Sequence, residues 1–450
     1  MTHIVYPTTN FKAIEQIKIE RGEGIYVYDD KGNQYIEGMA GLWCTALGYG
    51  NEELIEATTE QMRKLTYTHM FGGKTHQVAI DLADKLSAML PMNNATVFFG
   101  SSGSDANDSH IKMLRYYFAA IGKPEKRKII SRQRSYHGVT VAAASLTGLP
   151  VNQQHFDLPI DALGIIRTDH AHYYRGKQGN ETEVEFVDRI VGNLEAQILR
   201  EGPETIAAFI AEPVTGASGV LVPPAGYFEK VQALLNKYDI LMWTDEVITG
   251  FGRTGNDFGS ATVNIQKPDM MTLAKQLSSA YMPISAAAIR GDMYEAMADQ
   301  SAAAGAFGHG YTYSGHPVAC AVALKTLEIY ERDNIFAHAA ERGDYLQAQL
   351  AQFNDHPMVG EVRGRGLLAA VELVANKITG QEFANGSVGA TMVKNCQDNG
   401  LILRAVAGNS LAFCPPLIIS NEQIDDIISR FADALNKTYT FAQQNNLLLG

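Results

Sequence analysis

The feature that most constrains the fold is an alternation of short apolar runs with amphipathic stretches through the middle of the chain. Short, continuous runs that contain β-branched residues are typical of strands in a parallel sheet covered on both faces. The runs that we expect to form strands lie at residues 95–100, 127–132, 205–213, 239–246, 269–275 and 282–290.

Helical patterns lie between these runs, and the clearest is "SDANDSHIKMLRYYFAA" at residues 104–120. Its apolar residues Ile111, Leu114 and Phe118 recur at helical spacing, and Gly122 supplies a stop signal. Strands that alternate with helices predict an open α/β sheet with right-handed crossovers.

The two ends of the chain have a different pattern. Residues 24–38 read as a hairpin with a "DDKGN" turn. After about residue 330 a helix, the strand "GLLAAVEL", a helix, the strands "LILRAV" and "SLAFCPP" and a last helix are expected in order. We therefore expect an α/β protein with a large domain around a mostly parallel central sheet and a smaller α+β domain formed by both termini. The predicted boundaries are 1–60 and 331–450 for the small domain and 61–330 for the large domain.

The composition excludes several classes of protein. The chain has 450 residues, of which 46% are hydrophobic and 19% charged, as in ordinary globular proteins. A formal net charge of -12 argues against a nucleic-acid binder, which usually has a basic face. No apolar stretch approaches the ~20 residues that span a bilayer, and the N-terminus has no basic-then-apolar signal layout. We expect a cytoplasmic protein without a membrane partner.

No metal site or disulfide framework is expected. Four cysteines are scattered with no C-x-x-C pair, which favours reduced thiols. His69 and His76 do not belong to an H-E-x-x-H motif, so a metal role for them is disfavoured.

Three of the predicted strands end in ionisable residues. Glu212 follows "IAAFIA", Asp245 follows "ILMWT" and Lys275 follows "MMTLA". Open α/β sheets bind ligands beyond the carboxyl ends of their strands, so these groups indicate a site at one sheet edge. An unpaired buried ammonium is costly, so Lys275 must reach solvent or be bonded. The alternative is a buried ion-pair cluster with no ligand.

A glycine- and serine-rich turn, "GSSGSDAND" at residues 100–108, lies between a predicted strand and the long helix. Free N–H groups and the positive end of the helix dipole suit a phosphate there. The turn is neither a Walker loop nor a G-x-G-x-x-G motif, and the same residue types are ordinary helix caps.

A phosphate cradle, a strand-end aspartate and a strand-end lysine are together what pyridoxal phosphate requires. A lysine forms a Schiff base with the aldehyde, and an aspartate keeps the ring nitrogen protonated so that the ring accepts electrons. We therefore interpret Lys275 as the Schiff-base lysine.

The motifs along nearly the whole chain resemble those of class III (subgroup II) pyridoxal-phosphate-dependent aminotransferases, the family of the ω-amino acid:pyruvate and amine:pyruvate transaminases. They run from "GMAGLWCTALGYG" to "FCPPLIIS", and the most specific are "WTDEVITGFGRTG" and "MTLAKQLSSAYMPISA". The resemblance implies the fold-type I PLP-dependent transferase fold.

The resemblance implies a role for each matching residue around the coenzyme. Lys275 matches the catalytic Schiff-base lysine and Asp245 the partner of the pyridine nitrogen. Val247 matches the residue packed on one face of the ring. Tyr136 in "SYHG" matches the aromatic residue stacked on the other face, with His137 beside it.

Other matching residues concern the phosphate and the subunit interface. Ser102 and Gly103 match the phosphate loop, and Glu212 in "AEPV" matches a carboxylate near the cofactor. Thr312 in "HGYTYSGHP" matches a residue that binds the phosphate of the neighbouring subunit. A homodimer with shared active sites is therefore expected, and the sequence leaves open whether dimers pair into tetramers.

For the substrate pocket, Arg404 matches the mobile arginine of amine:pyruvate relatives, which binds a carboxylate or swings out for an apolar group. A planar bidentate donor suits that task. Leu42, Trp43, Phe71 and Tyr136 would supply the walls, with Phe71 a candidate to come from the other subunit.

The implied activity is transamination between an amine or ω-amino acid and a keto acid, with pyruvate favoured, through a Lys275 internal aldimine and a ping-pong mechanism. Other class III activities stay open: an α-amino acid or diamine aminotransferase, an aminomutase or a racemase. A nucleotide-binding dehydrogenase is disfavoured because no G-x-G-x-x-G follows a strand. Two positions depart from the common pattern: Asp105 replaces a frequent glutamate, and Gln276 replaces a frequent glycine and is expected to change packing beside the lysine.

Overall fold

The computed structural model describes residues 3–13 and 16–449, so residues 1–2, 14–15 and 450 of the predicted terminal segments lie outside the described residues. Its centre is a 7-stranded sheet in the order β4-β10-β9-β8-β7-β5-β6. The strands are β4 (Thr96–Gly100), β5 (Lys128–Arg132), β6 (Ile165–Thr168), β7 (Ile206–Ala211), β8 (Leu241–Asp245), β9 (Met270–Leu273) and β10 (Ser285–Ile289). All neighbouring strands are parallel except β10, which is antiparallel to both β4 and β9.

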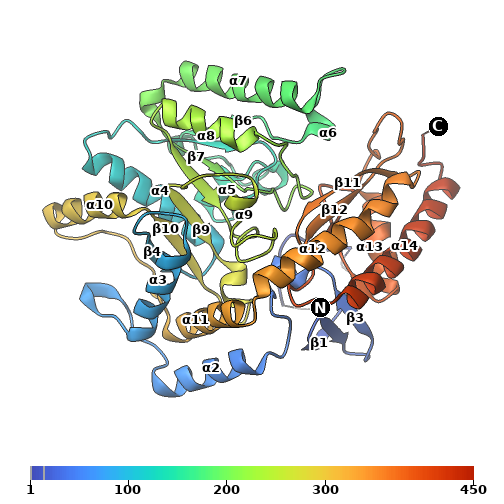
Figure 1. Cartoon of the computed structure of the whole chain (residues 1–450), viewed down its shortest axis with the longest axis horizontal. Helices are drawn as coiled ribbons and strands as arrows, with labels where there is room; N and C mark the ends of the chain where they lie inside the picture. The colour runs from blue at the N-terminus through green and yellow to red at the C-terminus, as the bar shows by residue number, and fades with distance from the viewer. Residues whose placement is uncertain (1–2, 14–15, 450) are drawn as a thin grey trace.

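Helices cover both faces of this sheet (Figure 1). Helices α7 (Glu183–Glu201) and α8 (Tyr227–Lys237) pack on one face, and α4 (Gly103–Ala120) and α10 (Gly291–Ala304) on the other. Along β7, Phe209 belongs to the first of these cores and Ile210 to the second. Because successive strand residues point to opposite faces, two-sided covering explains why the strands are continuously apolar.

There are two smaller sheets, and one of them combines strands from both ends of the chain. One has the order β1-β2-β3-β13 and the other β11-β12-β15-β14. Strand β13 pairs in parallel with β3, which joins the C-terminal part of the chain to the N-terminal hairpin. Their strands are β1 (Ile19–Glu23), β2 (Tyr26–Asp29), β3 (Gln34–Glu37), β11 (Val359–Arg365), β12 (Leu368–Leu373), β13 (Leu401–Ile402), β14 (Arg404–Val406) and β15 (Ser410–Phe413).

The remaining helices complete the layers. In Figure 1, α12, α13 and α14 lie beside β11 and β12, and α2, α3 and α11 form a group below the central sheet. The helices are α1 (Ala40–Trp43), α2 (Glu52–Lys64), α3 (Gln77–Met89), α5 (Val141–Leu146), α6 (Tyr173–Gly176), α9 (Gly259–Thr262), α11 (Pro317–Arg332), α12 (Ile335–Ala351), α13 (Ser387–Asp398) and α14 (Asn421–Gln444). Short 3-10 turns are η1 (Phe71–Gly73), η2 (Pro150–Asn152), η3 (Asp161–Leu163), η4 (Pro203–Thr205), η5 (Lys275–Ser278) and η6 (Gln352–Asp355). No helix among the described residues is long and apolar enough to cross a membrane.

The predicted strands of the central sheet are confirmed, as are the N-terminal hairpin and the long helix that became α4. Strands β1, β6 and β11 were not predicted, because "IERGE", "IIRT" and "VGEVRGR" carry charged residues that interrupt the apolar pattern. The prediction of one strand at "LILRAV" was wrong. Leu403 separates β13, which pairs with β3, from β14, which pairs with β15.

Candidate active site

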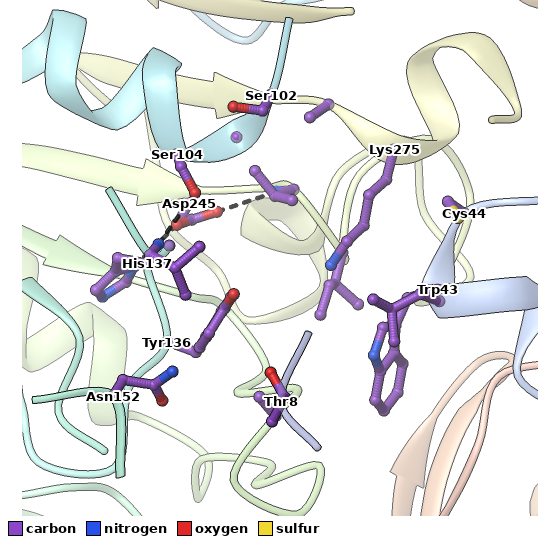
Figure 2. Close-up of a pocket in the computed structure, with 18 of the residues that line it drawn as sticks. Thr8, Trp43, Cys44, Ser102, Ser104, Tyr136, His137, Asn152, Asp245 and Lys275 are labelled. Atoms are coloured by element: carbon purple, nitrogen blue, oxygen red, sulfur yellow. Dashed lines mark hydrogen bonds and ion pairs between the residues drawn. The ribbon is translucent and has the colours of Figure 1, made fainter. Parts of the chain in front are cut away.

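A cavity of about 1320 Å³ opens at the carboxyl ends of β7, β8 and β9. Glu212, Asp245 and Lys275 all line it, so the three strand-end groups that the sequence singled out do meet. The reason is the strand order, since β7, β8 and β9 are adjacent and parallel. Figure 2 shows Lys275 reaching into the space between Asp245, Tyr136 and Trp43.

Lys275 begins the short turn η5 with φ of 45°. A positive φ is uncommon for a side chain of this size, and it marks a sharp change of direction directly after β9. The side chain is half-buried and its accessible part faces the cavity. Desolvation by burial lowers the pKa of Lys275, opposed by the nearby Cys44 and Asp245. A lowered pKa increases the fraction of neutral amine, which is the nucleophilic form.

Asp245 is surrounded by hydrogen-bond donors. Its Oδ2 lies 2.8 Å from Nδ1 of His137 and accepts a hydrogen bond of 3.1 Å from Nδ2 of Asn107. Its Oδ1 accepts a hydrogen bond of 3.2 Å from the backbone N–H of Val247. Asp245 and His137 are both buried. A buried carboxylate that meets only donors suits a partner that is also a donor, such as a protonated ring nitrogen.

The predicted phosphate loop lies at the N-terminus of α4. Ser102 is the N-cap, and with Asp105 it forms a reciprocal capping box. The side chain of Asp105 is shorter than the glutamate that is frequent at this position, but it still closes the capping box. A Cβ atom at Gly103 would lie 2.9 Å from Cγ2 of Val247, so a larger residue at this position would displace the Val247 side chain. The first helical N–H groups have no intrahelical partner, and Ser102, Gly103 and Ser104 line the cavity.

Glu212 supports the loop that carries Tyr136. Its two carboxylate oxygens each accept a 2.9 Å hydrogen bond, one from the backbone N–H of Tyr136 and one from that of Gly216. Burial raises the pKa of Glu212. Tyr136 is half-buried and lines the cavity, and its stacking on the coenzyme ring stays a prediction.

The far wall of the cavity is a strained segment that precedes α2. Ala40, Gly41 and Trp43 have φ values of 46°, 65° and 66°. Trp43 is buried, Leu42 is half exposed, and both line the cavity as predicted. Glu37 holds the start of this segment, because its Oε1 accepts a 3.1 Å hydrogen bond from the backbone N–H of Met39.

Comparisons with known proteins show which family has this arrangement of residues. The family model for class-III aminotransferases matches residues 9–435. The chain is a class III aminotransferase. Gamma-aminobutyrate transaminase 1, mitochondrial, of Oryza sativa subsp. japonica is 48% identical over 427 residues, which cover 94% of this chain and 82% of that protein. Gamma aminobutyrate transaminase 3, chloroplastic, of Solanum lycopersicum is 47% identical over 94% of this chain and 81% of that protein.

Solved structures agree with this assignment. The omega transaminase from Pseudomonas jessenii in complex with PMP has a TM-score of 0.95 and 51% sequence identity, covering 98% of this chain and 97% of that chain. A structure described as a transaminase with L-ala has a TM-score of 0.92 and 50% identity, covering 94% of this chain and 99% of that chain. The family uses pyridoxal 5'-phosphate, and the residues of the cavity fit that coenzyme. When bound, it supplies an aldehyde that bonds to an amine and a ring that accepts electrons.

Lys275 and Asp245 are the residues of this aminotransferase that would hold the two ends of the coenzyme ring. The N-terminus of α4 would hold the phosphate, and Val247 and Tyr136 line the same cavity. Sequence reasoning missed Asn107, which donates to Asp245. The signal that could have found Asn107 is its place on the apolar stripe of α4, one turn before Ile111, where a polar side chain needs a buried partner.

Sequence reasoning also missed the contribution of distant segments. Residues 7–9 and the thiol of Cys44 line the cavity, and Figure 2 shows Thr8 beneath the space that Lys275 and Tyr136 border. These contacts carry no local sequence signal, because they join segments that are far apart along the chain.

Gln276 does not border the cavity. Its Nε2 donates to the backbone carbonyl of Ile248 at 2.6 Å, and its Oε1 accepts a 3.3 Å hydrogen bond from Nε of Arg253. Gln276 therefore packs behind the cavity wall. There the amide ties η5 to the "ITGFGR" loop.

Phe71 and Thr312 lie outside the cavity of their own chain. Both are exposed on the surface, and they belong to one group. The hydroxyl of Tyr67 donates to the backbone carbonyl of Thr312 at 2.7 Å, and a Cβ atom at Gly310 would lie 3.0 Å from the ring of Phe71. Their predicted roles therefore require a second copy of the chain.

Outside the cavity, His172, Glu361 and Glu372 bring potential metal-ligand atoms within 4.8 Å of one another. Nη1 of Arg363 already bonds Glu361 at 2.6 Å and Glu372 at 2.5 Å. The guanidinium supplies the positive charge that a cation would bring, so this group is an ion-pair network.

Replacement of Lys275 by alanine is expected to reduce turnover by at least about 10²–10⁴-fold, because the general base and the covalent anchor are both lost. Steady-state kinetics with a saturating donor and acceptor would measure this. Lys394→Ala is a matched control, since Lys394 is exposed and pairs with Asp398 in its own helix. Near-normal turnover by Lys275→Ala would contradict the assignment.

Replacement of Glu37 by glutamine is expected to change how stability depends on pH. Burial raises the pKa of Glu37 from 4.5 to about 7. The folded protein therefore binds more protons than the unfolded chain between these values. The stability that this proton provides is fully present below the unfolded pKa and is lost as the pH rises through about 7.

The free energy of unfolding of Glu37→Gln minus that of the wild type should therefore increase between about pH 5 and pH 8. Its size is a few kcal/mol at most, at about 1.4 kcal/mol per pKa unit. Urea unfolding at several pH values would measure it, with the exposed Glu60→Gln as control. A difference that does not vary with pH would show that Glu37 titrates normally.

Proposed function

We propose that this aminotransferase moves the amino group of an ω-amino acid or an amine to pyruvate, in two half-reactions that use the same cavity. The observation that carries the proposal is that an exposed arginine, Arg404 on β14, and the indole of Trp43 line one cavity with Lys275. A guanidinium binds a carboxylate with two hydrogen bonds. An indole wall suits an apolar donor.

The relatives support the same substrate class. Two of them are named for gamma-aminobutyrate, which is an ω-amino acid, and a solved relative is an omega transaminase. Another solved relative is described with L-alanine, which is the compound that amination of pyruvate produces. These names support an ω-amino donor and pyruvate as acceptor here.

The residues of this chain divide the work of each half-reaction. Lys275 Nζ would hold the coenzyme and, as a free amine, would be the base that moves the proton of the donor carbon. Asp245 holds negative charge beside the ring nitrogen while electrons move into the ring. Arg404 holds the carboxylate of the keto acid, and Trp43 packs against the donor. The other class III activities would use the same Lys275 and Asp245, so a donor panel measured against pyruvate is the direct test.

Replacement of Arg404 by alanine is expected to raise KM for pyruvate and β-alanine about 10- to 100-fold, because a charge-assisted bidentate contact is lost. KM for an aryl amine such as 1-phenylethylamine should change much less, since it has no carboxylate. The KM of each substrate would be measured from initial rates at a saturating concentration of the second substrate. These values would show whether the carboxylate substrates are affected more than the aryl amine.

Arg365→Ala is the matched control for Arg404→Ala. Arg365 is also an exposed strand arginine, and it donates to the carbonyl of Gly364. Equal losses for carboxylate and aryl-amine substrates in Arg404→Ala would rule out a carboxylate-binding role.

A homodimer with shared active sites is part of the proposal. The group formed by Tyr67, Phe71, Thr312 and Tyr313 supports it, since Tyr313 is 61% and Phe71 49% exposed. An exposed aromatic cluster of this kind is typical of a protein interface. A second copy would place Thr312 at the phosphate and Phe71 in the pocket wall. The cytoplasmic location inferred from the sequence stays a prediction.

Sedimentation equilibrium is expected to give a dimer or a pair of dimers, and Thr312→Val should weaken coenzyme binding about tenfold by removing one hydrogen bond to a charged group. Titration of the apoenzyme with pyridoxal phosphate would measure the affinity. Thr440→Val, at an exposed threonine of α14, is the control. A monomer with full coenzyme affinity would contradict the shared site.

A further inference from the structure

A chain of hydrogen bonds begins at a buried indole and ends on Asp245. Nε1 of Trp243 donates to Oγ1 of Thr272 at 2.9 Å. The Thr272 hydroxyl donates to Oδ1 of Asn107 at 2.7 Å. Nδ2 of Asn107 donates to Oδ2 of Asp245 at 3.1 Å and to the backbone carbonyl of His137 at 2.7 Å.

The direction of every bond in this chain is fixed by its first member. An indole N–H can only donate, so the oxygen of Thr272 must accept and its own hydrogen must point to another acceptor. That acceptor is the amide oxygen of Asn107, which forces the amide NH₂ group toward Asp245. The orientation of a buried amide is often ambiguous, but the backbone carbonyl of His137 can only accept, and it independently requires the same orientation of the Asn107 NH₂ group.

The residues of this hydrogen-bond chain are isolated from solvent, so water cannot replace any of them. Trp243 and Thr272 are 0% exposed and Asn107 is 1% exposed. The ring of His110 packs on Trp243 with centroids 5.0 Å apart. Burial lowers the pKa of His110 to about 4, so this ring is neutral and brings no charge to the chain. An unpaired polar atom is costly in such surroundings.

Strand register explains why these residues meet. Thr272 on β9 is the register partner of Asp245 on β8. Asn107 lies on the face of α4 that packs over these strands. The chain therefore connects two strands and a helix at the one carboxylate that would bind the pyridine nitrogen.

We propose that Asn107, Thr272 and Trp243 are positioning residues that present donors, and never an acceptor, to Asp245. A proton on Oδ2 of Asp245 would face the NH₂ group of Asn107, which can only donate. The carboxylate is thereby aimed and kept as an acceptor for the protonated ring nitrogen. The inference depends on coenzyme binding in this family and not on the proposed donor, the acceptor or Arg404.

Thr272→Val tests the proposal, because valine has the shape of threonine and suits a strand. The variant should bind pyridoxal phosphate about tenfold more weakly, since two buried polar groups lose their partner. The pH midpoint of the visible absorption of the bound coenzyme should also shift. Thr272→Ser keeps the hydroxyl and should restore both values.

Thr326→Val is the matched control for Thr272→Val. Thr326 is also a fully buried threonine, and its hydroxyl donates to the carbonyl of Val322 in its own helix. This control is expected to lose thermal stability without a change in coenzyme affinity or absorption midpoint. The proposal is wrong if Thr272→Val changes neither the coenzyme affinity nor the absorption midpoint by more than Thr326→Val does.

A double-mutant cycle tests whether Thr272 acts through Asn107. Asn107→Leu should weaken coenzyme binding more than Thr272→Val, because it removes the donor that touches Asp245. Adding Thr272→Val to Asn107→Leu should then have no further effect, since coupled residues are non-additive. Losses that add fully would show that Thr272 acts independently and would overturn the chain as a unit. All of these measurements use the coenzyme alone, so failure of the proposed substrate class would leave them unaffected.

Discussion

A primary amine in a desolvated position at the end of a strand is the constraint on which the rest of the active site depends. Lys275 lies two residues after the end of β9 with a positive φ, and burial lowers the pKa of its ammonium group. Burying a charged lysine in an apolar wall is unfavourable. A lowered pKa favours the neutral amine, and a covalent adduct removes the ammonium charge altogether; coenzyme chemistry uses both states.

The carboxylates around this lysine are held by different means. Asp245 ends β8, the parallel neighbour of β9, and Glu212 follows β7, the next strand in the sheet. Glu212 is bound by two backbone N–H groups, and it holds the loop of Tyr136 in place. Asp245 is held by the side chains of His137 and Asn107, so its donors come from elements outside its own strand. Glu212 thus fixes the backbone around the site, whereas Asp245 is positioned to bind a ligand.

The fold could be predicted from the sequence where the residue pattern is strong. Continuous apolar runs predicted the strands that are covered on both faces, and the "DDKGN" turn predicted the N-terminal hairpin. Polar edge strands such as β6 and β11 were missed, because one exposed side lets Arg167 or Glu361 interrupt the pattern. The division of "LILRAV" between two sheets could not be predicted, since it depends on which distant strands β13 and β14 meet.

The sequence by itself determined the chemical groups of the site: a lysine and two carboxylates at strand ends, a glycine-rich helix start and the motifs of class III aminotransferases. Only the tertiary structure decided which groups face Asp245 and from where. Asn107 and Thr272 are far apart along the chain, and they meet because α4 packs over β9. It also placed Phe71 and Thr312 on the surface rather than in their own cavity. Sequence patterns report local periodicity and burial, whereas hydrogen bonds between distant segments depend on the packing of whole elements.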